Sequence, residues 1–394
     1  MDATHLRAWW FHKQGLDGSL NGSSSQEVLK KTGWSRSVGG SNPYQTLFAR
    51  NGSSREDIDK SVSKLEIYEL PSARGCTYVV PASHYALALK LSQDFHNDEN
   101  VAVKFLGVTP KELDKLSDRI LKALEKGPQD PRQLKESLGD AVRNLGEAGK
   151  KKGMTTTLPI ALGKLQSGGK IRRVPLNGRL DQQRYAYASW SPSPLDKFKL
   201  NSDEAYVELA RLFFQWIGPA SIKEFQWFSG LGVAAANAAV KPLKLVPVES
   251  GSDLLILADE LDSFQKFRAP KNPQYALLSC LDGLFLLRRN LAHLLDEKDG
   301  KRQVMVDKSL KNLIGLQDLP SNAIVDRGRI IGLWEFDALK QEIVWNSFIT
   351  ADKKLKEVVA ATEKFISEQL GDARSFSLDS PESRKSRIDA IRKA

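Results

Sequence analysis

The chain has 394 residues, of which 41% are hydrophobic and 27% charged, and it carries a net charge of +10 at pH 7. This length predicts about two to four folded units, and the composition excludes a largely disordered chain. Two distant cysteines and five scattered histidines exclude a disulfide framework and a metal centre, and no apolar run reaches the roughly 20 residues of a membrane span, so we expect a cytoplasmic protein without cofactors.

The N-terminal segment, residues 1–108, is predicted to form a first winged-helix unit with an inserted strand region. Apolar periodicity indicates a helix over Leu6–Gln14, which Gly15 ends. Ser25 is placed to cap a second helix that runs through Lys31, and Gly33 ends that helix.

The next segment, residues 109–200, has the element order of a winged helix. An amphipathic helix is predicted over Lys111–Lys126, where Gly127-Pro128 stops it, and a short helix follows over Pro131–Leu138. Thr157 is expected to cap a third helix that reaches Gln166. In a winged helix this third helix enters the major groove of DNA.

A hairpin is predicted directly after the third helix. Its strands are Lys170–Leu176 and Arg179–Tyr187, and the dipeptide Asn177-Gly178 between them suits the two positive φ angles of a type I′ turn. Three helices followed by a basic hairpin is the order of a winged helix, in which the hairpin lies along the DNA backbone or minor groove.

The same segment concentrates the positive charge of the chain. Nine basic residues lie between positions 150 and 184, and Asp181 is the one acid among them, so nine minus one leaves +8 of the net +10 there. Such a surface favours a polyanion as its partner, because binding releases the counterions of the polyanion. The nine are Lys150, Lys151, Lys152, Lys164, Lys170, Arg172, Arg173, Arg179 and Arg184.

A third unit is predicted over residues 201–250 with a similar order. Glu204–Ile217 reads as a helix stopped by Gly-Pro, Ser221 caps a short helix through Phe228, and a helix over Val233–Val240 precedes a strand. Residues 251–372 are predicted to form a β-barrel or sheet covered by a helix over about Asp352–Leu370, and residues 373–394 a mobile basic tail. The predicted fold is therefore α+β, with three tandem winged-helix units and a C-terminal barrel or sheet region with a terminal helix.

Several short islands carry a family resemblance in consistent order. They are Leu6–Trp10, Pro43-Tyr44 with Leu47–Arg50, Ser72–Ala82, Gly218–Ser221, Phe225–Leu231 and Gly328–Trp334. Together they resemble the AlkZ-like winged-helix DNA glycosylase family. The resemblance implies three winged-helix units around a β-barrel, a positively charged concave face, and excision of alkylated or cross-linked purines from DNA.

The catalytic element of that family is a Gln-x-Gln or Gln-x-Asp triplet upstream of the segment that matches Pro43–Arg50. In this chain Ser35 and Ser37 stand at the two matching positions, with Arg36 between them. A serine hydroxyl reaches less far than a glutamine amide, and a cation there opposes an oxocarbenium ion. The sequence therefore predicts weak base excision or none, and Glu69 and Asp59 are the alternative candidate carboxylates.

Three functions remain open on this sequence. The first is recognition of damaged duplex DNA with low sequence specificity, by Arg36 together with the nine basic residues named above. The second is an active glycosylase with a different residue set, and the third is a transcription regulator or a repeat scaffold for protein partners. For the first we expect a monomer, associated with the nucleoid, that binds double-stranded DNA and neither a membrane nor a metal.

Overall fold

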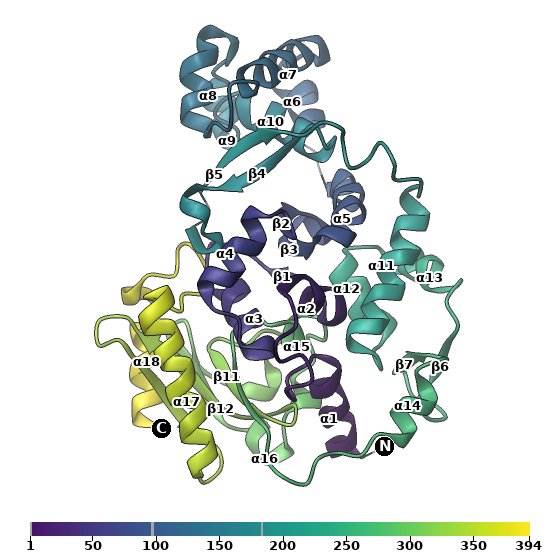
Figure 1. Cartoon of the computed structure of the whole chain (residues 1–394), viewed down its shortest axis with the longest axis vertical. Helices are drawn as coiled ribbons and strands as arrows, with labels where there is room; N and C mark the ends of the chain where they lie inside the picture. Colours follow the sequence, from purple (N-terminus) through teal and green to yellow (C-terminus); the bar gives the residue numbers. More distant parts are fainter. Residues whose placement is uncertain (1, 96–97, 183) are drawn as a thin grey trace.

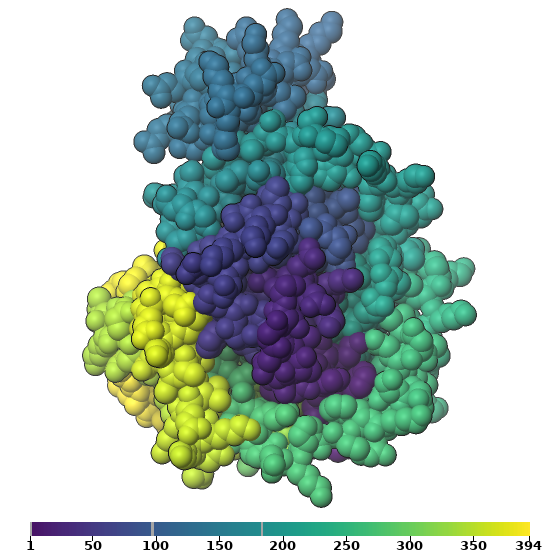
Figure 2. All heavy atoms as spheres, viewed as in Figure 1, coloured from purple at the N-terminus to yellow at the C-terminus, as the bar shows by residue number. Residues whose placement is uncertain are grey.

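The computed structural model describes residues 2–95, 98–182 and 184–394. It shows a protein of mixed helices and sheets. The described residues from 98 to 189 project from the remaining body, and we call this part the head (Figures 1 and 2). Two hydrophobic cores stabilise the larger body, and the head has a core of its own, formed by residues between Ala102 and Tyr187. In the described part of the chain, no helix has the length and apolarity to cross a membrane.

The N-terminal part wraps helices around a three-stranded antiparallel sheet of order β1-β3-β2. Ser35 is paired with Val79 of the central strand, and Glu69 is paired with the same Val79 from the other side. The elements are α1 (Ala3–Lys13), α2 (Ser25–Thr32), β1 (Ser35–Arg36), α3 (Asn42–Asn51), α4 (Arg55–Ser63), β2 (Ile67–Pro71), β3 (Thr77–Pro81) and α5 (Tyr85–Ser92). The cap of α2 is Ser24 and not the predicted Ser25.

The head contains the predicted helices and hairpin in their predicted order. Its elements are α6 (Asp98–Phe105), α7 (Pro110–Leu124), α8 (Pro131–Leu138), α9 (Gly146–Lys151), α10 (Leu158–Ser167), β4 (Ile171–Pro175) and β5 (Tyr185–Ser189). Thr157 precedes α10 but does not cap it through its side chain, because its hydroxyl oxygen accepts a hydrogen bond from the Arg143 amide instead.

The third part confirms the predicted helices closely. Asn201 and Glu204 form a capping box at the start of α11, and Ser221 and Glu224 form another at the start of α12. The elements are α11 (Ser202–Ile217), α12 (Ile222–Ser229), α13 (Val233–Val240), β6 (Leu245–Pro247), β7 (Leu255–Leu257) and α14 (Leu261–Lys266).

The C-terminal part is built on a four-stranded antiparallel sheet of order β13-β12-β11-β8, so a sheet is the observed form of the predicted barrel or sheet. The helices α17 and α18 both lie at the left of Figure 1, but α17 packs against β8 and β13 whereas α18 packs against β12, β13 and β9, and their buried side chains belong to different hydrophobic cores. The elements are β8 (Tyr275–Leu278), α15 (Gly283–Leu286), α16 (Glu297–Gly300), β9 (Gln303–Val306), β10 (Ser309–Asn312), β11 (Asn322–Asp326), β12 (Arg329–Asp337), β13 (Glu342–Ser347), α17 (Lys353–Phe365) and α18 (Pro381–Lys393).

The hairpin loop differs from the predicted two-residue turn. Asn177 and Gly178 do have positive φ angles of 59° and 72°, but β4 ends at Pro175 and β5 begins at Tyr185. The long tip is held by tertiary contacts, since the Leu180 amide donates to the Tyr44 hydroxyl at 2.9 Å. These contacts outweigh the local turn preference of Asn-Gly.

The C-terminal segment was predicted to be mobile, and the structure contradicts this. It forms α18, which packs against β12, β13 and β9. Arg384, Ile388 and Ile391 are buried, and Arg387 donates a 2.7 Å hydrogen bond to Glu335. Ile388 and Ile391, three residues apart, form a short apolar face on an otherwise basic helix, and this face anchors the segment.

Candidate nucleic-acid interface and active site

The two serines at the candidate catalytic positions share one face of the sheet β1-β3-β2. Because side chains alternate along a strand, Ser35 and Ser37 point to the same side, and Glu69 points there too through its pairing with Val79. Arg36 points to the opposite side and lies over the ring of Tyr78. The structure thus separates Arg36 from the two serines that flank it.

Both serine hydroxyls are engaged inside the protein. Ser37 is fully buried and donates a hydrogen bond to a carboxylate oxygen of Glu69, 32 residues away. Ser35 donates to the Thr46 hydroxyl at 3.3 Å and accepts from the Asn42 amide at 3.2 Å. In this arrangement neither hydroxyl is available to orient a water molecule at a DNA sugar.

Glu69 is a buried carboxyl with an unusual environment. Burial raises its pKa above the ordinary value, and this outweighs the opposing effects of the Arg173 charge and of the Ser37 hydrogen bond. The other candidate carboxylate, Asp59, accepts a 2.6 Å hydrogen bond from the Tyr44 hydroxyl, and burial raises its pKa as well. Of the two, only Glu69 contacts a candidate catalytic position.

The loop after Ser37 is covered by the C-terminal segment. The Ser41 amide donates to the Arg374 carbonyl at 2.9 Å, and the Ser377 amide donates to the Val38 carbonyl at 3.0 Å. Gly40 makes this contact possible, because a Cβ there would lie 2.3 Å from the Ser375 carbonyl oxygen. The C-terminal segment therefore closes over the residues next to the candidate catalytic positions.

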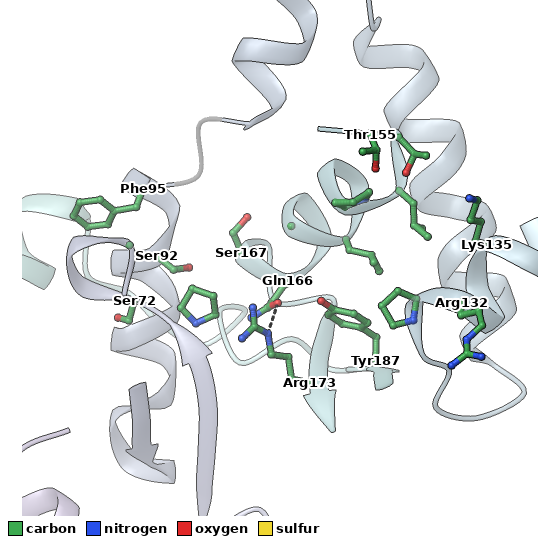
Figure 3. Close-up of a pocket in the computed structure, with 18 residues that line it drawn as sticks. Ser72, Ser92, Phe95, Arg132, Lys135, Thr155, Gln166, Ser167, Arg173 and Tyr187 are labelled. Carbon is green, nitrogen blue, oxygen red and sulfur yellow. Dashed lines mark hydrogen bonds between the residues drawn. The ribbon is translucent and has the colours of Figure 1, made fainter. Parts of the chain in front are cut away.

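A cleft of about 550 Å³ lies between the head and the end of β2 (Figure 3). Gln166, Arg173 and Tyr187 form its middle, and Arg132 and Lys135 of α8 line one side. The Arg173 guanidinium donates to the Gln166 side chain at 3.3 Å, and its buried Nη1 has no hydrogen-bond partner among the described residues. A buried cation with an unused donor favours an anionic ligand.

The basic residues predicted to bind DNA fall into three groups. Lys150, Lys151, Lys152, Lys170 and Arg184 are exposed. Arg172 and Arg173 are half-buried and lie over the rings of Trp190 and Tyr185.

The third group, Lys164 and Arg179, is already neutralised within the protein. Lys164 forms ion pairs with Glu99 at 2.8 Å and with Asp114 at 2.9 Å. Arg179 donates to Asp181 at 2.9 Å and also contacts the Leu370 carbonyl, which fixes the hairpin tip to the π-helical turn Ile366–Leu370 that follows α17. The count of basic residues along the sequence could not show these partners, because most of them come from distant segments.

The sequence-based prediction missed Arg132 and Lys135. Both are exposed, and their spacing of three residues places them on one face of α8. The sequence did predict the helix Pro131–Leu138 that carries both residues. The basic residues were counted between positions 150 and 184, so these two cations, which lie upstream, were left out.

The buried Glu69 leads to a prediction on stability against pH. A carboxyl whose folded pKa is raised contributes its full stability below the unfolded value near 4.5, and that contribution is lost as the pH rises through the folded pKa. We expect Glu69→Gln to match the parent near pH 4 and to exceed it in melting temperature increasingly from pH 5 to 8. Glu136→Gln, at an exposed position of α8, is the control, and a Glu69→Gln difference independent of pH would contradict the expectation.

Comparison with known proteins settles the family. A family model described as DNA glycosylase AlkZ-like matches residues 32–372, which is most of the chain. The chain belongs to the AlkZ-like DNA glycosylase family.

A solved structure agrees with this membership. The structure of the Streptomyces sahachiroi DNA glycosylase AlkZ is similar, with a TM-score of 0.69 over 95% of this chain and 98% of that chain. Because the two sequences are 18% identical, the similarity shows a common fold and nothing beyond the fold. No curated protein sequence matches the chain. In the described residues, no group of three or more His, Cys, Asp or Glu side chains could hold a metal ion.

Proposed function

We propose that this AlkZ-like protein recognises damaged duplex DNA, with low sequence specificity and without efficient base excision. The observation that carries the proposal is the cleft beside β2, where the Arg173 Nη1 is unpartnered and Arg132 and Lys135 are exposed. Phosphate groups are the anions that such guanidinium and ammonium groups bind in nucleic-acid complexes. The family membership makes DNA the polyanion concerned.

The head is proposed to act as a winged helix, one of three in the chain. Helices α7, α8 and α10 are followed by the hairpin β4–β5, which is the order of that motif. The proposed units span residues 1–108, 109–200 and 201–250, with the sheet region over residues 251–372. Because Arg179 anchors the tip to the body, the hairpin would present its basic strand β4 rather than its tip to DNA.

The surface of α10 supports the proposal of low sequence specificity. Most of this helix is buried against α6 and α7, and the part that faces the cleft is largely apolar or small: Pro159, Leu162 and Gly163. Gln166 is its one amide side chain in the cleft lining, and Arg173 already donates to it. Base-edge recognition needs several such side chains, so we propose that phosphate contacts dominate.

Duplex binding should therefore depend on the three cleft cations and on salt. We expect Arg132→Ala/Lys135→Ala/Arg173→Ala to bind duplex DNA roughly tenfold more weakly or worse at 0.1 M salt. The slope of log affinity against log salt should become shallower by about 0.9 for each phosphate that the variant no longer neutralises. Fluorescence anisotropy with two unrelated duplexes measures both quantities and tests whether the sequences bind alike.

A charge-matched variant of the head is the control. Lys115→Ala/Arg119→Ala/Lys122→Ala removes three cations from α7, which does not contribute to the described lining of the cleft. This variant should keep the parent's affinity and nearly all of its salt slope. Equal decreases in affinity for the two triple variants would show that total charge, and not the cleft, governs binding.

A second candidate function is base excision through Glu69. Its carboxyl contacts Ser37, and a carboxylate can steady an oxocarbenium ion or activate water. This would require the sheet face to open, since Glu69 and Ser37 are both buried. Base release measured on Glu69→Gln separates this candidate from recognition without excision.

A further inference from the structure

A second cavity, of about 370 Å³, lies on the opposite side of the sheet from the two serines. Trp34, Arg36 and Tyr78 line it from the sheet, and Trp227 and Arg289 line it from α12 and from the segment after α15. This volume is within the range of small-molecule sites and is sufficient for a ligand of mononucleotide size.

Three guanidinium groups meet in this pocket with little opposing charge. Arg289 is paired with Asp318, at 2.9 Å between Nε and Oδ1. Arg36 and Arg74 form no ion pair or hydrogen bond through their side chains with any described residue, and the Arg36 Nη1 is buried without a partner. Like charges this close repel each other, so an anion in the pocket would be bound favourably.

The guanidinium groups of the three arginines lie over aromatic rings. The Arg74 and Arg289 guanidinium carbons lie 4.0 and 4.2 Å from the ring centre of Trp227, and that of Arg36 lies 5.5 Å from the ring centre of Tyr78. Stacking uses the face of a guanidinium and leaves the N–H groups in its plane free to donate to a phosphate.

The backbone also holds Arg74 in place at a cost. Its φ angle is 58°, in the left-handed region that glycine adopts without strain. Strained non-glycine residues of this kind concentrate at functional sites, because the surrounding structure must enforce them. Trp34 and two further lining residues, Phe228 and Leu319, offer apolar surface against which a flat ring can pack.

We propose that this arginine–tryptophan pocket binds a nucleobase that carries a phosphate monoester. The net positive charge disfavours an alkylated purine, which is itself cationic, so the pocket is distinct in chemistry from a lesion pocket. Two sources share the proposed chemistry: a free mononucleotide, and the phosphorylated end of a DNA strand.

The position of the pocket is compatible with either source. The turn over Ala73–Gly75 separates it from the cleft, because Ser72 and Gly75 line the cleft whereas Arg74 and Cys76 line the pocket. A strand end held in the cleft would therefore have a short path to the arginines.

Titration of the full chain with dAMP, followed by tryptophan fluorescence, tests the pocket without any DNA. We expect saturable binding that inorganic phosphate competes against, and at least tenfold weaker binding of deoxyadenosine. Arg36→Gln and Arg74→Gly should each weaken dAMP binding tenfold or more. Arg74→Gly is informative because glycine suits the φ angle at this position, so a loss of binding with an unchanged melting temperature reports the missing guanidinium.

Two controls keep this test separate from the DNA-binding proposal. Arg119→Gln, exposed on α7, and the triple variant of the cleft should both bind dAMP like the parent. Equal affinity for dAMP and deoxyadenosine, unchanged dAMP affinity in Arg36→Gln and Arg74→Gly, or no saturable binding by the parent would each overturn the proposal.

Oligonucleotides with and without a 5′-phosphate distinguish the two sources. A preference for the phosphorylated oligonucleotide that disappears in Arg74→Gly supports strand ends, and dAMP binding without that preference supports a free nucleotide. Weaker binding of unphosphorylated duplex DNA in Arg74→Gly, with no binding of dAMP to the parent, would instead assign the pocket to the DNA backbone and overturn the inference.

Discussion

Replacement of Asp282 by alanine should lower the free energy of unfolding by about 3–5 kcal/mol. The Asp282 carboxylate accepts two hydrogen bonds from Arg50, at 2.7 and 2.8 Å, and both side chains are 1% exposed. The same guanidinium donates to Gln14 at 2.8 Å. Without Asp282 the Arg50 charge would stay buried and uncompensated, and α3 would no longer be tied to the start of α15.

An exposed ion pair provides the matched control for this prediction. Lys266 and Asp262 are paired at 2.8 Å, with side chains 75% and 73% exposed. Asp262→Ala should change the free energy of unfolding by no more than about 1 kcal/mol, because water screens the pair. Urea denaturation of both variants gives the comparison. Similar small decreases in the two would mean that water reaches Arg50 in the folded protein.

Much of the fold could be predicted from the sequence, and the helices show why. The predicted helix Glu204–Ile217 is observed as Ser202–Ile217, and Val233–Val240 is observed with the predicted bounds. Apolar residues at helical spacing, a capping residue and a terminal glycine are local features of the sequence, so they predict a helix without knowledge of the tertiary structure. The predicted mobile tail failed because the surface that buries Arg384 comes from distant strands.

The hairpin shows the limit of local signals. Asn-Gly correctly predicted positive φ angles, but the loop is longer because Leu180 and Arg179 bind partners 136 and 191 residues away. Such contacts carry no local pattern. The same holds for Lys164, which has the sequence context of a DNA contact but is paired with Glu99 and Asp114 in the folded chain.

The candidate catalytic positions could be located only through the family resemblance. Composition and spacing single out neither Ser35 nor Ser37, since serines are common in loops. Glu69 was a candidate carboxylate, but its contact with Ser37 depends on the order β1-β3-β2, which places them on either side of a central strand. That strand order is a tertiary property, and the sequence alone does not predict it.

The unaltered protein should release alkylated purines from duplex DNA at no more than about one-hundredth of the rate of a family member that has the glutamine pair. A serine hydroxyl reaches less far than a glutamine amide, so it would be displaced from the position of the catalytic group. A displacement of about 1 Å can cost a hundredfold in rate. In addition, the Ser37 hydroxyl is committed to Glu69 and the Ser35 hydroxyl to Thr46. Single-turnover base release from alkylated duplex DNA is the measurement.

Insertion of the pair should not restore the activity in this fold. Ser37 is fully buried and Ser35 is 4% exposed, so Ser35→Gln/Ser37→Gln forces longer side chains into filled space and should cost about 1–3 kcal/mol of stability. A gain in base release by this double variant would show that the sheet face opens on DNA. Fast release by the unaltered protein, abolished in Glu69→Gln and kept in Asp59→Asn, would contradict the expectation and assign the chemistry to Glu69.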